Sequence, residues 1–268
     1  MSSERTRHIL SLSGGKDSTA LAIHLRDRVP GLEYVFCDTE KELPETYEYL
    51  DRLEAYLGQP IVRLKHDGRG FDHWLVVYRG FLPSTQMRWC TKHLKIQPFE
   101  KYVGDDKVVN YIGIRSDEDR LGYISTRPNI RASFPFKDDG IDRAGVMRIL
   151  EESGLGLPKY YEWRSRSGCY FCFFQQKIEW VGLLDTHREK FLEAMAYEKV
   201  AKNGLRYTWQ QGESLEELSR PERIAQIRAD HQRSLEREMI RKPNSTLLEL
   251  FEGVTEDRLD SPCTICSL

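Results

Sequence analysis

The sequence predicts an α/β fold with a doubly wound, mostly parallel sheet, followed by a helical extension that contains cysteines. Short apolar segments alternate with helical segments over the first half of the chain, which is the β-α-β order of a parallel sheet. A glycine turn joins the first strand to the first helix, and helix signals dominate after Tyr160. We therefore expect an α/β domain over residues 1–165 and a helical region over residues 166–268.

The elements of the α/β domain follow from apolar spacing and from turn residues. Apolar runs of strand length predict strands at residues 9–12, 32–37, 60–64 and 108–114, with residues 134–136 as a last edge strand. Helical spacing predicts helices at residues 16–27, 44–57, 71–78, 92–103 and 140–153. Pro44 suits the first turn of its helix, whereas Pro98 is expected to kink the helix that contains it.

The helical region is expected to begin with a long helix over residues 175–202, where apolar residues recur at helical spacing. Ser214 and Glu217 have the spacing of a capping box, which predicts the start of another, highly charged helix. Residues 245–251 predict a further short helix. The charges of the helix that begins at Ser214 and runs towards Met239 are typical of a solvated face.

The composition limits the classes of protein that the chain can represent. It has 268 residues, 40% of them hydrophobic, and a net charge of −2, so a sizeable core is possible and no overall positive field attracts nucleic acid. The first residues show no apolar signal region, and no apolar run reaches membrane length. We therefore expect a cytoplasmic protein with no membrane partner. Its six cysteines are then expected to be metal ligands or reactive thiols rather than disulfides.

The glycine turn has the residues of a phosphate-binding loop. Its sequence over residues 13–18 is Ser-Gly-Gly-Lys-Asp-Ser. Glycines let the backbone approach a phosphate, and the start of a helix offers unpaired N–H groups and the positive end of the helix dipole. Lys16 adds a mobile cation, and Ser13 and Ser18 add hydroxyl groups. The spacing differs from that of the Walker loop, but it predicts a cradle for the phosphates of a nucleotide.

Polar residues also follow two other predicted strands. Asp38 and Thr39 come directly after the strand at residues 32–37, and Arg115 and Arg120 come just past the fourth strand. Ligands of parallel α/β sheets bind beyond the carboxyl ends of the strands. These residues are therefore expected near the glycine turn, where the arginines could stabilise developing negative charge.

The sequence of residues 13–18 resembles the signature of the PP-loop ATP pyrophosphatases, a superfamily with the adenine nucleotide alpha hydrolase-like fold. Residues 38–46 (Asp-Thr followed by Leu-Pro-Glu-Thr) and Gly113-Ile-Arg115 with Arg120 are similar to segments of phosphoadenylyl-sulfate (PAPS) reductases. Reductases of this branch carry a catalytic cysteine in a C-terminal Glu-Cys-Gly-Ile/Leu-His tail. The present sequence lacks that pattern, which disfavours a reductase in the literal sense.

A third stretch points to a different branch of the same superfamily. Arg88-Trp-Cys-Thr-Lys92 with Lys95 resembles the ATP pyrophosphatases of bacterial DNA phosphorothioation systems. That resemblance implies an enzyme that cleaves ATP between its α- and β-phosphates, adenylylates a substrate oxygen and supports sulfur transfer to the DNA backbone, in phage defence. It also implies a cysteine desulfurase as the sulfur donor and other phosphorothioation proteins as partners.

The resemblance implies roles for the residues of the predicted site, with ATP and Mg²⁺ as the expected ligands. The residues expected to bind them are Ser13, Gly14, Gly15, Lys16, Asp17, Ser18, Asp38, Thr39 and Gly113. The residues expected in catalysis are Lys16, Asp17, Cys37, Arg115 and Arg120, with Lys92 and Lys95 as further cations. Two of these roles have alternatives. The arginines could instead form a salt-bridge network with neighbouring carboxylates, and Cys37 is either a buried small side chain or a persulfide acceptor.

Cys169 and Cys172 form a Cys-x-x-Cys pair that suits a soft metal ion. With Cys90 the pair supplies three thiolates for a [4Fe–4S] cluster, as the resemblance to cluster-containing reductases implies. The fourth iron is then open or bound by another cysteine, Cys263 or Cys266. Alternatively, Cys263 and Cys266 complete a structural Zn²⁺ site with the same pair. Free reduced thiols are the third alternative.

Other functions stay open at this point. They are the reduction of a sulfonucleotide to sulfite, the thiolation of transfer RNA, and a non-catalytic nucleotide-binding subunit. DNA is expected to contact the protein only through a local patch in which basic residues alternate with aromatic ones that could stack on bases, although a mixed surface is an equal alternative. The residues of this patch are Arg127, Arg131, Lys137, Arg143, Tyr160, Tyr161, Trp163, Arg164 and Arg166.

Overall fold

The computed structural model describes residues 6–119, 125–200 and 206–240, which divide into two compact units. The described part of the first unit comprises residues 6–79, 86–119 and 125–169, and that of the second comprises residues 80–85, 170–200 and 206–240. The main part of the second unit thus begins at Tyr170. The unit also includes residues 80–85, which lie in the middle of the predicted first domain. Within that unit, the ring of Phe81 packs 4.4 Å from the ring of Tyr207, a contact between distant residues that no local pattern reveals.

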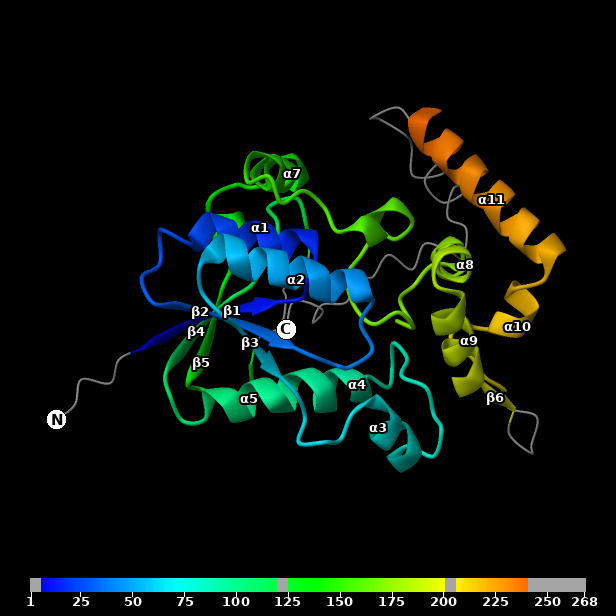
Figure 1. The fold of residues 1–268 in the computed structure, drawn as a ribbon, viewed down its shortest axis with the longest axis horizontal. Coiled ribbons are helices and arrows are strands. Elements are labelled where there is room, and N and C mark those ends of the chain that lie inside the picture. Colours follow the sequence, from blue (N-terminus) through cyan, green and yellow to red (C-terminus); the bar gives the residue numbers. More distant parts are fainter. Residues whose placement is uncertain (1–5, 120–124, 201–205, 241–268) are drawn as a thin grey trace. The chain divides into compact units, whose positions relative to one another are not determined.

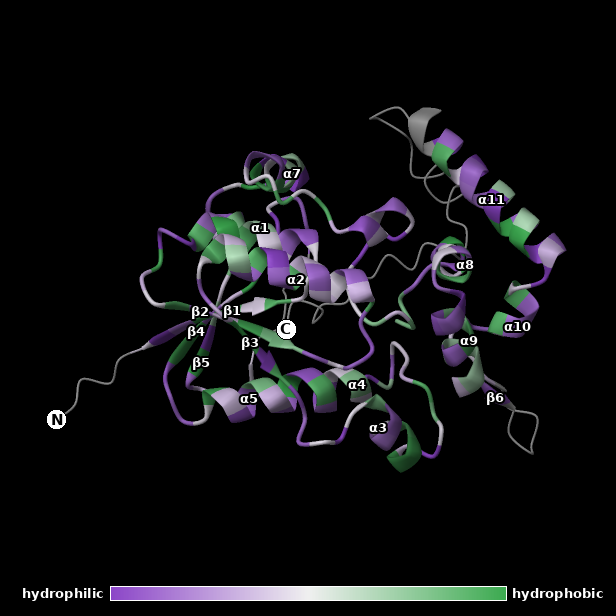
Figure 2. Ribbon diagram, in the orientation of Figure 1, coloured by the Kyte–Doolittle hydropathy of each residue, from purple (hydrophilic) through white to green (hydrophobic). Residues whose placement is uncertain are grey.

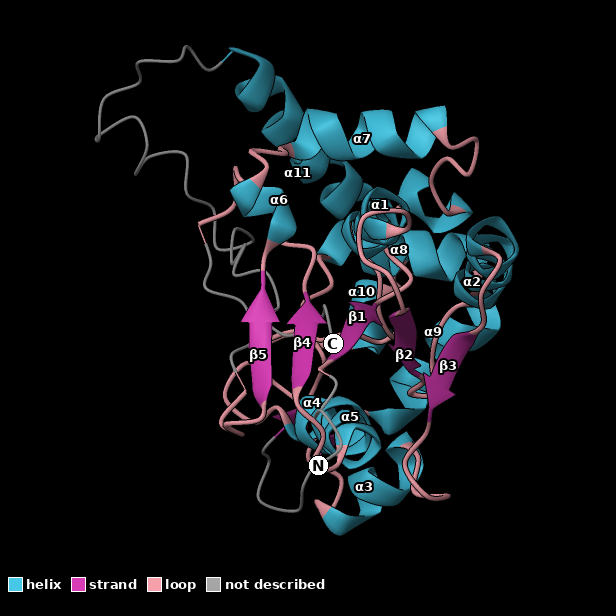
Figure 3. Cartoon of the chain, turned by 90° about the vertical axis from the view of Figure 1, so that its left-hand side faces the viewer, coloured by secondary structure: helices cyan, strands magenta, loops and turns pink. Residues whose placement is uncertain are grey.

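A five-stranded parallel sheet forms the centre of the first unit (Figure 3). The strand order is β3-β2-β1-β4-β5, so the sheet is doubly wound and the predicted fold class is confirmed. The strands are β1 (Arg7–Leu12), β2 (Leu32–Cys37), β3 (Ile61–Leu64), β4 (Val108–Tyr111) and β5 (Ile130–Ser133). The chain winds from β1 to β2 and β3 on one side, then continues with β4 and β5 on the other side of β1. The strand order therefore changes direction between β1 and β4. Sheets of this kind bind ligands at that position, beyond the carboxyl ends of the strands.

Helices cover both faces of this sheet (Figure 1). The helices on one face are α1 (Lys16–Leu25), α2 (Pro44–Leu57) and α7 (Arg143–Glu152). Those on the other face are α3 (Phe71–Val77), α4 (Trp89–Thr91), the π-helix η1 (Lys92–Ile96) and α5 (Gln97–Val103). Strands buried on both faces need apolar side chains throughout, which explains the near-continuous apolar runs in the sequence and the hydrophobic colouring of the strands in Figure 2.

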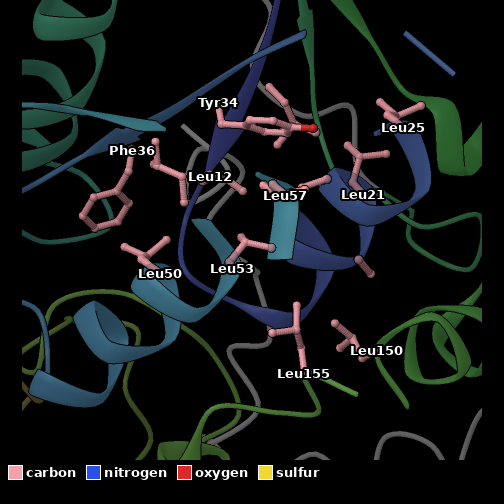
Figure 4. Close-up of a cluster of buried hydrophobic side chains, with 14 of the residues drawn as sticks. Leu12, Leu21, Leu25, Tyr34, Phe36, Leu50, Leu53, Leu57, Leu150 and Leu155 are labelled. Atoms are coloured by element: carbon pink, nitrogen blue, oxygen red, sulfur yellow. The ribbon is translucent and has the colours of Figure 1, made fainter. Parts of the chain in front are cut away.

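Two apolar clusters hold the layers together. The larger one joins α1, α2 and α7 to the sheet through residues such as Leu12, Leu21 and Leu50, all of which are fully buried (Figure 4). The second cluster packs Phe99 of α5 against Ile9 and other side chains on the opposite face. The burial of these side chains fixes α1 against the carboxyl half of β1 and so fixes the turn between them.

Two details of the α/β region differ from the prediction. The edge strand expected at residues 134–136 is wrong, because β5 ends at Ser133 and Pro135 begins the short helix α6 (Pro135–Asp138). Proline cannot donate to a sheet ladder but suits the first turn of a helix. Residues 92–103 are helical as predicted, but the first five of them form the π-helix η1, which directly precedes α5. The kink at Pro98 stays a prediction.

The described part of the second unit is mainly helical. Its elements are α8 (Lys177–Thr186), α9 (Arg188–Tyr197), the hairpin strands β6 (Lys199–Val200) and β7 (Arg206–Tyr207), α10 (Leu215–Leu218) and α11 (Pro221–Ile240). The single helix predicted for residues 175–202 is wrong, since His187 leaves helical geometry and separates α8 from α9.

The capping box at Ser214 is confirmed, but the helix that it begins, α10, is short because Pro221 starts a new helix. The helix predicted at residues 245–251 lies outside the described residues. Among the residues that are described, no helix combines the length and the apolar character that crossing a bilayer requires.

Candidate functional site

The glycine loop between β1 and α1 is a tight turn held by its own hydroxyl groups. Gly14 has φ +71°, and a Cβ there would lie 2.7 Å from Cγ2 of Thr46 on α2, so only glycine fits. The Ser13 N–H donates to Oγ of Ser18 at 3.1 Å, and that hydroxyl donates to the Gly15 carbonyl at 3.2 Å. The loop predicted from the sequence is therefore a preformed turn at the centre of the sheet's carboxyl edge.

The side chain of the N-cap residue does not cap the first backbone amides of α1. Its N-cap residue is Gly15, which has no side chain to accept from the first-turn amides. Lys16 and Asp17 follow directly, with the Lys16 ammonium 3.4 Å from Oδ2 of Asp17. A helix start with free amide capacity and an adjacent cation is suited to bind an anion.

The end of β4 closes against this loop. A Cβ on Gly113 would lie 3.0 Å from the Asp17 carbonyl oxygen and 3.2 Å from the Ser18 nitrogen, so glycine is needed for the close backbone approach. Two residues later, the Arg115 guanidinium is 3.0 Å from Oδ1 of Asp17. The structure thus brings Lys16, Asp17, Gly113 and Arg115 together, as predicted from their positions after β1 and β4.

Arg115 also forms ion pairs with the neighbouring acidic residues. Its guanidinium lies 2.9 Å from Asp117 and 2.8 Å from Glu118. These contacts form the salt-bridge network given as the alternative, and the network reaches the glycine loop through Asp17. The catalytic role of Arg115 stays a prediction. Arg120, the other predicted catalytic arginine, lies outside the described residues.

The end of β2 holds a second polar cluster. Asp38 is buried, and its Oδ1 accepts from the Glu40 N–H at 2.8 Å and from the Tyr47 hydroxyl at 2.7 Å, while Lys65 lies 3.4 Å from Oδ2. The Thr39 hydroxyl is also buried and donates to Oε1 of Glu42 at 2.8 Å. Asp38 and Thr39 are rigidly held side chains at the carboxyl edge, where the sequence placed them.

Glu42 is a site residue that the sequence analysis missed. It is only 5% exposed, and burial raises the pKa of its carboxyl group. Its Oε2 atom has no hydrogen-bond partner in the described part of the chain. The thiol of Cys169 lies 3.7 Å from the other oxygen and 3.1 Å from the Thr39 hydroxyl. A glutamate within a charged stretch is normally a surface residue, so only the fold reveals this burial.

A segment of residues 157–167, here named the cover segment, lies against the glycine loop. The Tyr160 hydroxyl donates to the Gly14 carbonyl at 2.8 Å, and the Lys16 N–H donates to the Tyr161 hydroxyl at 3.1 Å. The Ser167 hydroxyl is 3.1 Å from that of Ser13. The sequence analysis placed the two tyrosines in a nucleic-acid patch and gave no role to the serine, because their proximity to the loop depends on the fold.

Two arginines of the predicted DNA patch are bound within the protein. Arg164 is 3% exposed and donates to the backbone carbonyls of Gly168 and Cys169 at 3.0 and 2.7 Å. Arg127 donates to the carbonyls of Glu100 and Gly104. The guanidinium groups of these two arginines are hydrogen-bonded to backbone carbonyls of the protein. A DNA contact by the patch therefore depends on its other residues, and it stays a prediction.

The cysteines lie in different surroundings. Cys37 is 4% exposed within the second apolar cluster, its thiol donates to the Lys95 carbonyl at 3.5 Å, and burial raises its pKa to about 12. These surroundings favour the packing role among the two that were open, and the catalytic role of Cys37 stays a prediction. The thiol of Cys90 lies 4.0 Å from the hydroxyl of the adjacent Thr91.

The predicted metal site is not assembled in the described residues. No group of three or more His, Cys, Asp or Glu side chains there is placed to hold one ion, and the thiol of Cys169 contacts Thr39 and Glu42. Cys172 belongs to the second unit, and the last two cysteines lie outside the described residues. The iron–sulfur and zinc sites therefore stay predictions, and no step of the chemistry is derived from them.

The fold and the glycine loop define a class of protein, a parallel α/β domain with a glycine-rich strand–turn–helix at its centre. Residues 7–136 match the family model described as the phosphoadenosine phosphosulfate reductase domain. These residues contain the whole sheet and the loop, so the match to that domain extends over all five strands of the first unit. The resemblance to the reductase branch is confirmed at this level.

Similarity to other proteins extends over more of the chain. An uncharacterized protein of Methanocaldococcus jannaschii is 32% identical over 178 residues, which cover 61% of this chain and 35% of that protein. An uncharacterized 37.8 kDa protein of Escherichia phage 186 is 25% identical over 74% of this chain and 76% of its own length. The chain thus spans about a third of the archaeal relative.

A nin region protein of Escherichia phage lambda is 28% identical over 66% of this chain and 68% of its own length. Among solved structures, the PAPS reductase from Candida auris in a phosphate complex superimposes with a TM-score of 0.49 and 15% sequence identity, covering 62% of this chain and 82% of that one.

Proposed function

We propose that this protein is an ATP pyrophosphatase that adenylylates a substrate oxygen and supports the replacement of that oxygen by sulfur, with the DNA backbone as the acceptor. The observation that carries the proposal is the glycine loop with Lys16, Asp17 and Arg115 at the point where the winding of the sheet reverses. Open α/β sheets bind nucleotides at this point, and the start of α1 supplies amides and a positive dipole end for their phosphates.

In the proposed reaction, a substrate oxygen attacks the α-phosphorus of ATP and pyrophosphate leaves. The resulting AMP ester is then displaced by a sulfur nucleophile, so the oxygen leaves with AMP and the new bond is to sulfur. Negative charge grows on the pyrophosphate in the first step. Lys16 and the amides of α1 lie where they can stabilise that charge, and Arg115 holds Asp17 in place beside them.

Mg²⁺ is the expected companion of the nucleotide. It is usually bound by one or two carboxylates together with phosphate oxygens and water. Asp17, in the first turn of α1, and Asp38, directly after β2, would supply these carboxylates. Lys16 lies beside Asp17, and Lys65 and the Tyr47 hydroxyl hold Asp38. Bound Mg²⁺ would neutralise charge on the leaving pyrophosphate.

The test is a reaction of the full chain with ATP, Mg²⁺, a cysteine desulfurase with L-cysteine, and either DNA or transfer RNA. The proposal expects pyrophosphate and AMP in equal amounts, together with phosphorothioate linkages in the DNA digest measured by mass spectrometry. Thiolated nucleosides in the RNA digest would move the acceptor to transfer RNA. Release of ADP with phosphate, or no ATP turnover with any acceptor, would contradict the proposal.

Sulfonucleotide reduction is the second candidate, and the match of residues 7–136 to the reductase domain favours it. It requires a thiol that attacks the sulfonyl sulfur, followed by the release of sulfite with a dithiol reductant. Incubating the protein with adenylyl sulfate or phosphoadenylyl sulfate and a thioredoxin-type donor, and measuring sulfite, distinguishes the two candidates. Sulfite formation without ATP turnover would establish the second one.

A further inference from the structure

We propose that Tyr161 is an internal competitor for the phosphate site, and that nucleotide binding displaces it together with the cover segment. The inference rests on the proposed function, because it names the contact that phosphate must replace at the glycine loop. It concerns residues that all lie in the first unit.

Tyr161 supplies the cap that α1 lacks. Gly15, the N-cap residue, has no side chain, and the first amide of the helix, that of Lys16, donates instead to the Tyr161 hydroxyl at 3.1 Å. A phosphate oxygen bound at this helix start would accept from the same N–H. The cover segment also occupies the space over the loop, since a Cβ on Gly15 would lie 2.5 Å from Oγ of Ser167. The hydroxyl and a phosphate oxygen therefore exclude each other at this amide.

The tyrosine contact is of the kind that an anion can replace. Burial raises the pKa of Tyr161, so its hydroxyl stays neutral, and a neutral acceptor is weaker than a charged phosphate oxygen at the same donor. The Lys16 ammonium lies 5.1 Å from the centre of the Tyr161 ring, a cation–π contact that a phosphate would outcompete as a partner. The remaining contacts to the loop, from Tyr160 and Ser167, are also made by neutral hydroxyls.

Glycines in left-handed conformations bracket the cover segment. Gly154 and Gly156 precede it with φ of +73° and +62°, and Gly168 follows it with φ +128°. Space is open around the Cβ position of each. The base before the segment is fixed to α2, because Tyr49 and Arg52 donate to the carbonyls of Gly156 and Leu155 at 2.7 and 2.8 Å. A fixed base with permissive residues at both ends is the arrangement of a hinged segment.

The test compares Tyr161→Phe with Tyr160→Phe. Each variant loses one hydroxyl and keeps the ring, but Tyr160 donates to a carbonyl, which no phosphate can use, whereas Tyr161 accepts from the amide. Titration calorimetry with inorganic pyrophosphate and with ATP and Mg²⁺ is expected to show roughly tenfold tighter binding for Tyr161→Phe, since the lost hydrogen bond is worth about 1.4 kcal/mol. Tyr160→Phe is expected to show no gain.

Hydrogen exchange of the ligand-free protein provides a readout that does not require nucleotide binding. The Lys16 amide is expected to exchange faster in Tyr161→Phe than in the wild type, and at an unchanged rate in Tyr160→Phe. Unchanged exchange in Tyr161→Phe, or equal or weaker ligand binding, would overturn the displacement. If exchange accelerates but neither the wild type nor the variant binds any nucleotide, the capping contact stands and the proposed function fails.

Discussion

Two polar clusters lie at the carboxyl edge of the sheet, and they differ in charge and in burial. The glycine loop after β1 is held by serine hydroxyls and backbone groups, and it presents Lys16 with the start of α1. The cluster after β2 consists of carboxylates, of which Asp38 and Glu42 are buried. The first is suited to hold an anion and the second to hold a cation or a proton. Two positions at one edge of the sheet therefore have opposite electrostatic preferences.

The largest expected effect tests the anion side of this comparison. Lys16→Ala removes the ammonium group beside the loop, and we expect the affinity for ATP to fall by about 100-fold or more, because a charge-assisted contact worth roughly 3 kcal/mol is lost. Calorimetry measures the change. Lys101→Ala is the matched control, since that lysine pairs with Asp67 at an exposed position. Equal affinities of the two variants would show that the loop is not the phosphate site.

A second prediction concerns the packing that holds the loop in place. In Gly113→Ala the new Cβ meets the backbone of Asp17 and Ser18, which cannot move without shifting the start of α1. We expect a loss of about 1–3 kcal/mol in the free energy of unfolding and weaker ATP binding, measured by urea denaturation and calorimetry. In the control, Gly70→Ala, the Cβ meets only the end of the Glu40 side chain at 3.0 Å, so little change is expected. An unaltered affinity of Gly113→Ala for ATP would show that the segment after β4 does not contribute to the nucleotide site.

The third prediction tests the acidic side through its pH dependence. Burial raises the pKa of Glu42, so the folded chain holds this proton more tightly than the unfolded chain. The stability that it contributes is full below pH of about 4 and is lost as the pH rises through the folded-state pKa. We expect Glu42→Gln to lose this dependence and to be more stable than the wild type at pH 8, by on the order of 1 kcal/mol, but not at pH 4.

Urea denaturation of both proteins at several pH values gives the comparison, and the difference between them isolates Glu42 from other groups. Glu48→Gln, at an exposed position of α2, the helix that follows Glu42, is the control and is expected to have the same pH dependence as the wild type. If the free energy of unfolding had the same pH dependence in Glu42→Gln and in the wild type, the Glu42 carboxyl group would be hydrated in solution. The acidic cluster would then not be buried as described.

The sequence was sufficient for the parts of the site that follow strands directly. The glycine loop, Asp38, Thr39 and Arg115 lie where strand–turn–helix patterning placed them, because parallel strands bring their carboxyl ends to one edge whatever the loop lengths. Helix boundaries were predictable where a proline or a capping box marked them, as at Pro44 and Ser214. The same local rules misplaced the edge strand, since Pro135 was read as part of an apolar run rather than as the start of a helix.

What the sequence could not reveal depends on contacts between distant segments. Tyr161 and Lys16 are far apart in the chain, so their hydrogen bond has no local signal. The burial of Glu42 depends on α2 and on the segment that carries Cys169. The hydrogen bonds from Arg164 to the carbonyls of Gly168 and Cys169 depend on the conformation of that same segment. In each case a polar residue that composition assigns to the surface has found a partner through tertiary packing.

The smallest expected effect concerns Cys37, the last residue of β2, which directly precedes the acidic cluster. Its thiol belongs to the apolar layer beside Ile9, Val35 and Phe99, and burial raises its pKa to about 12, so very little thiolate forms near neutral pH. We therefore expect Cys37→Ala to lose about 1 kcal/mol of stability through a small cavity and to keep ATP turnover and sulfur transfer. Mass spectrometry after iodoacetamide treatment of the native protein is expected to find Cys37 unmodified and the more exposed Cys90 alkylated. A folded variant that turned over ATP but transferred no sulfur would contradict this prediction. The thiol of Cys37 would then have to reach the site through a local opening of β2. The carboxyl edge would in that case contain a sulfur-carrying residue in addition to the phosphate cluster and the buried acidic cluster.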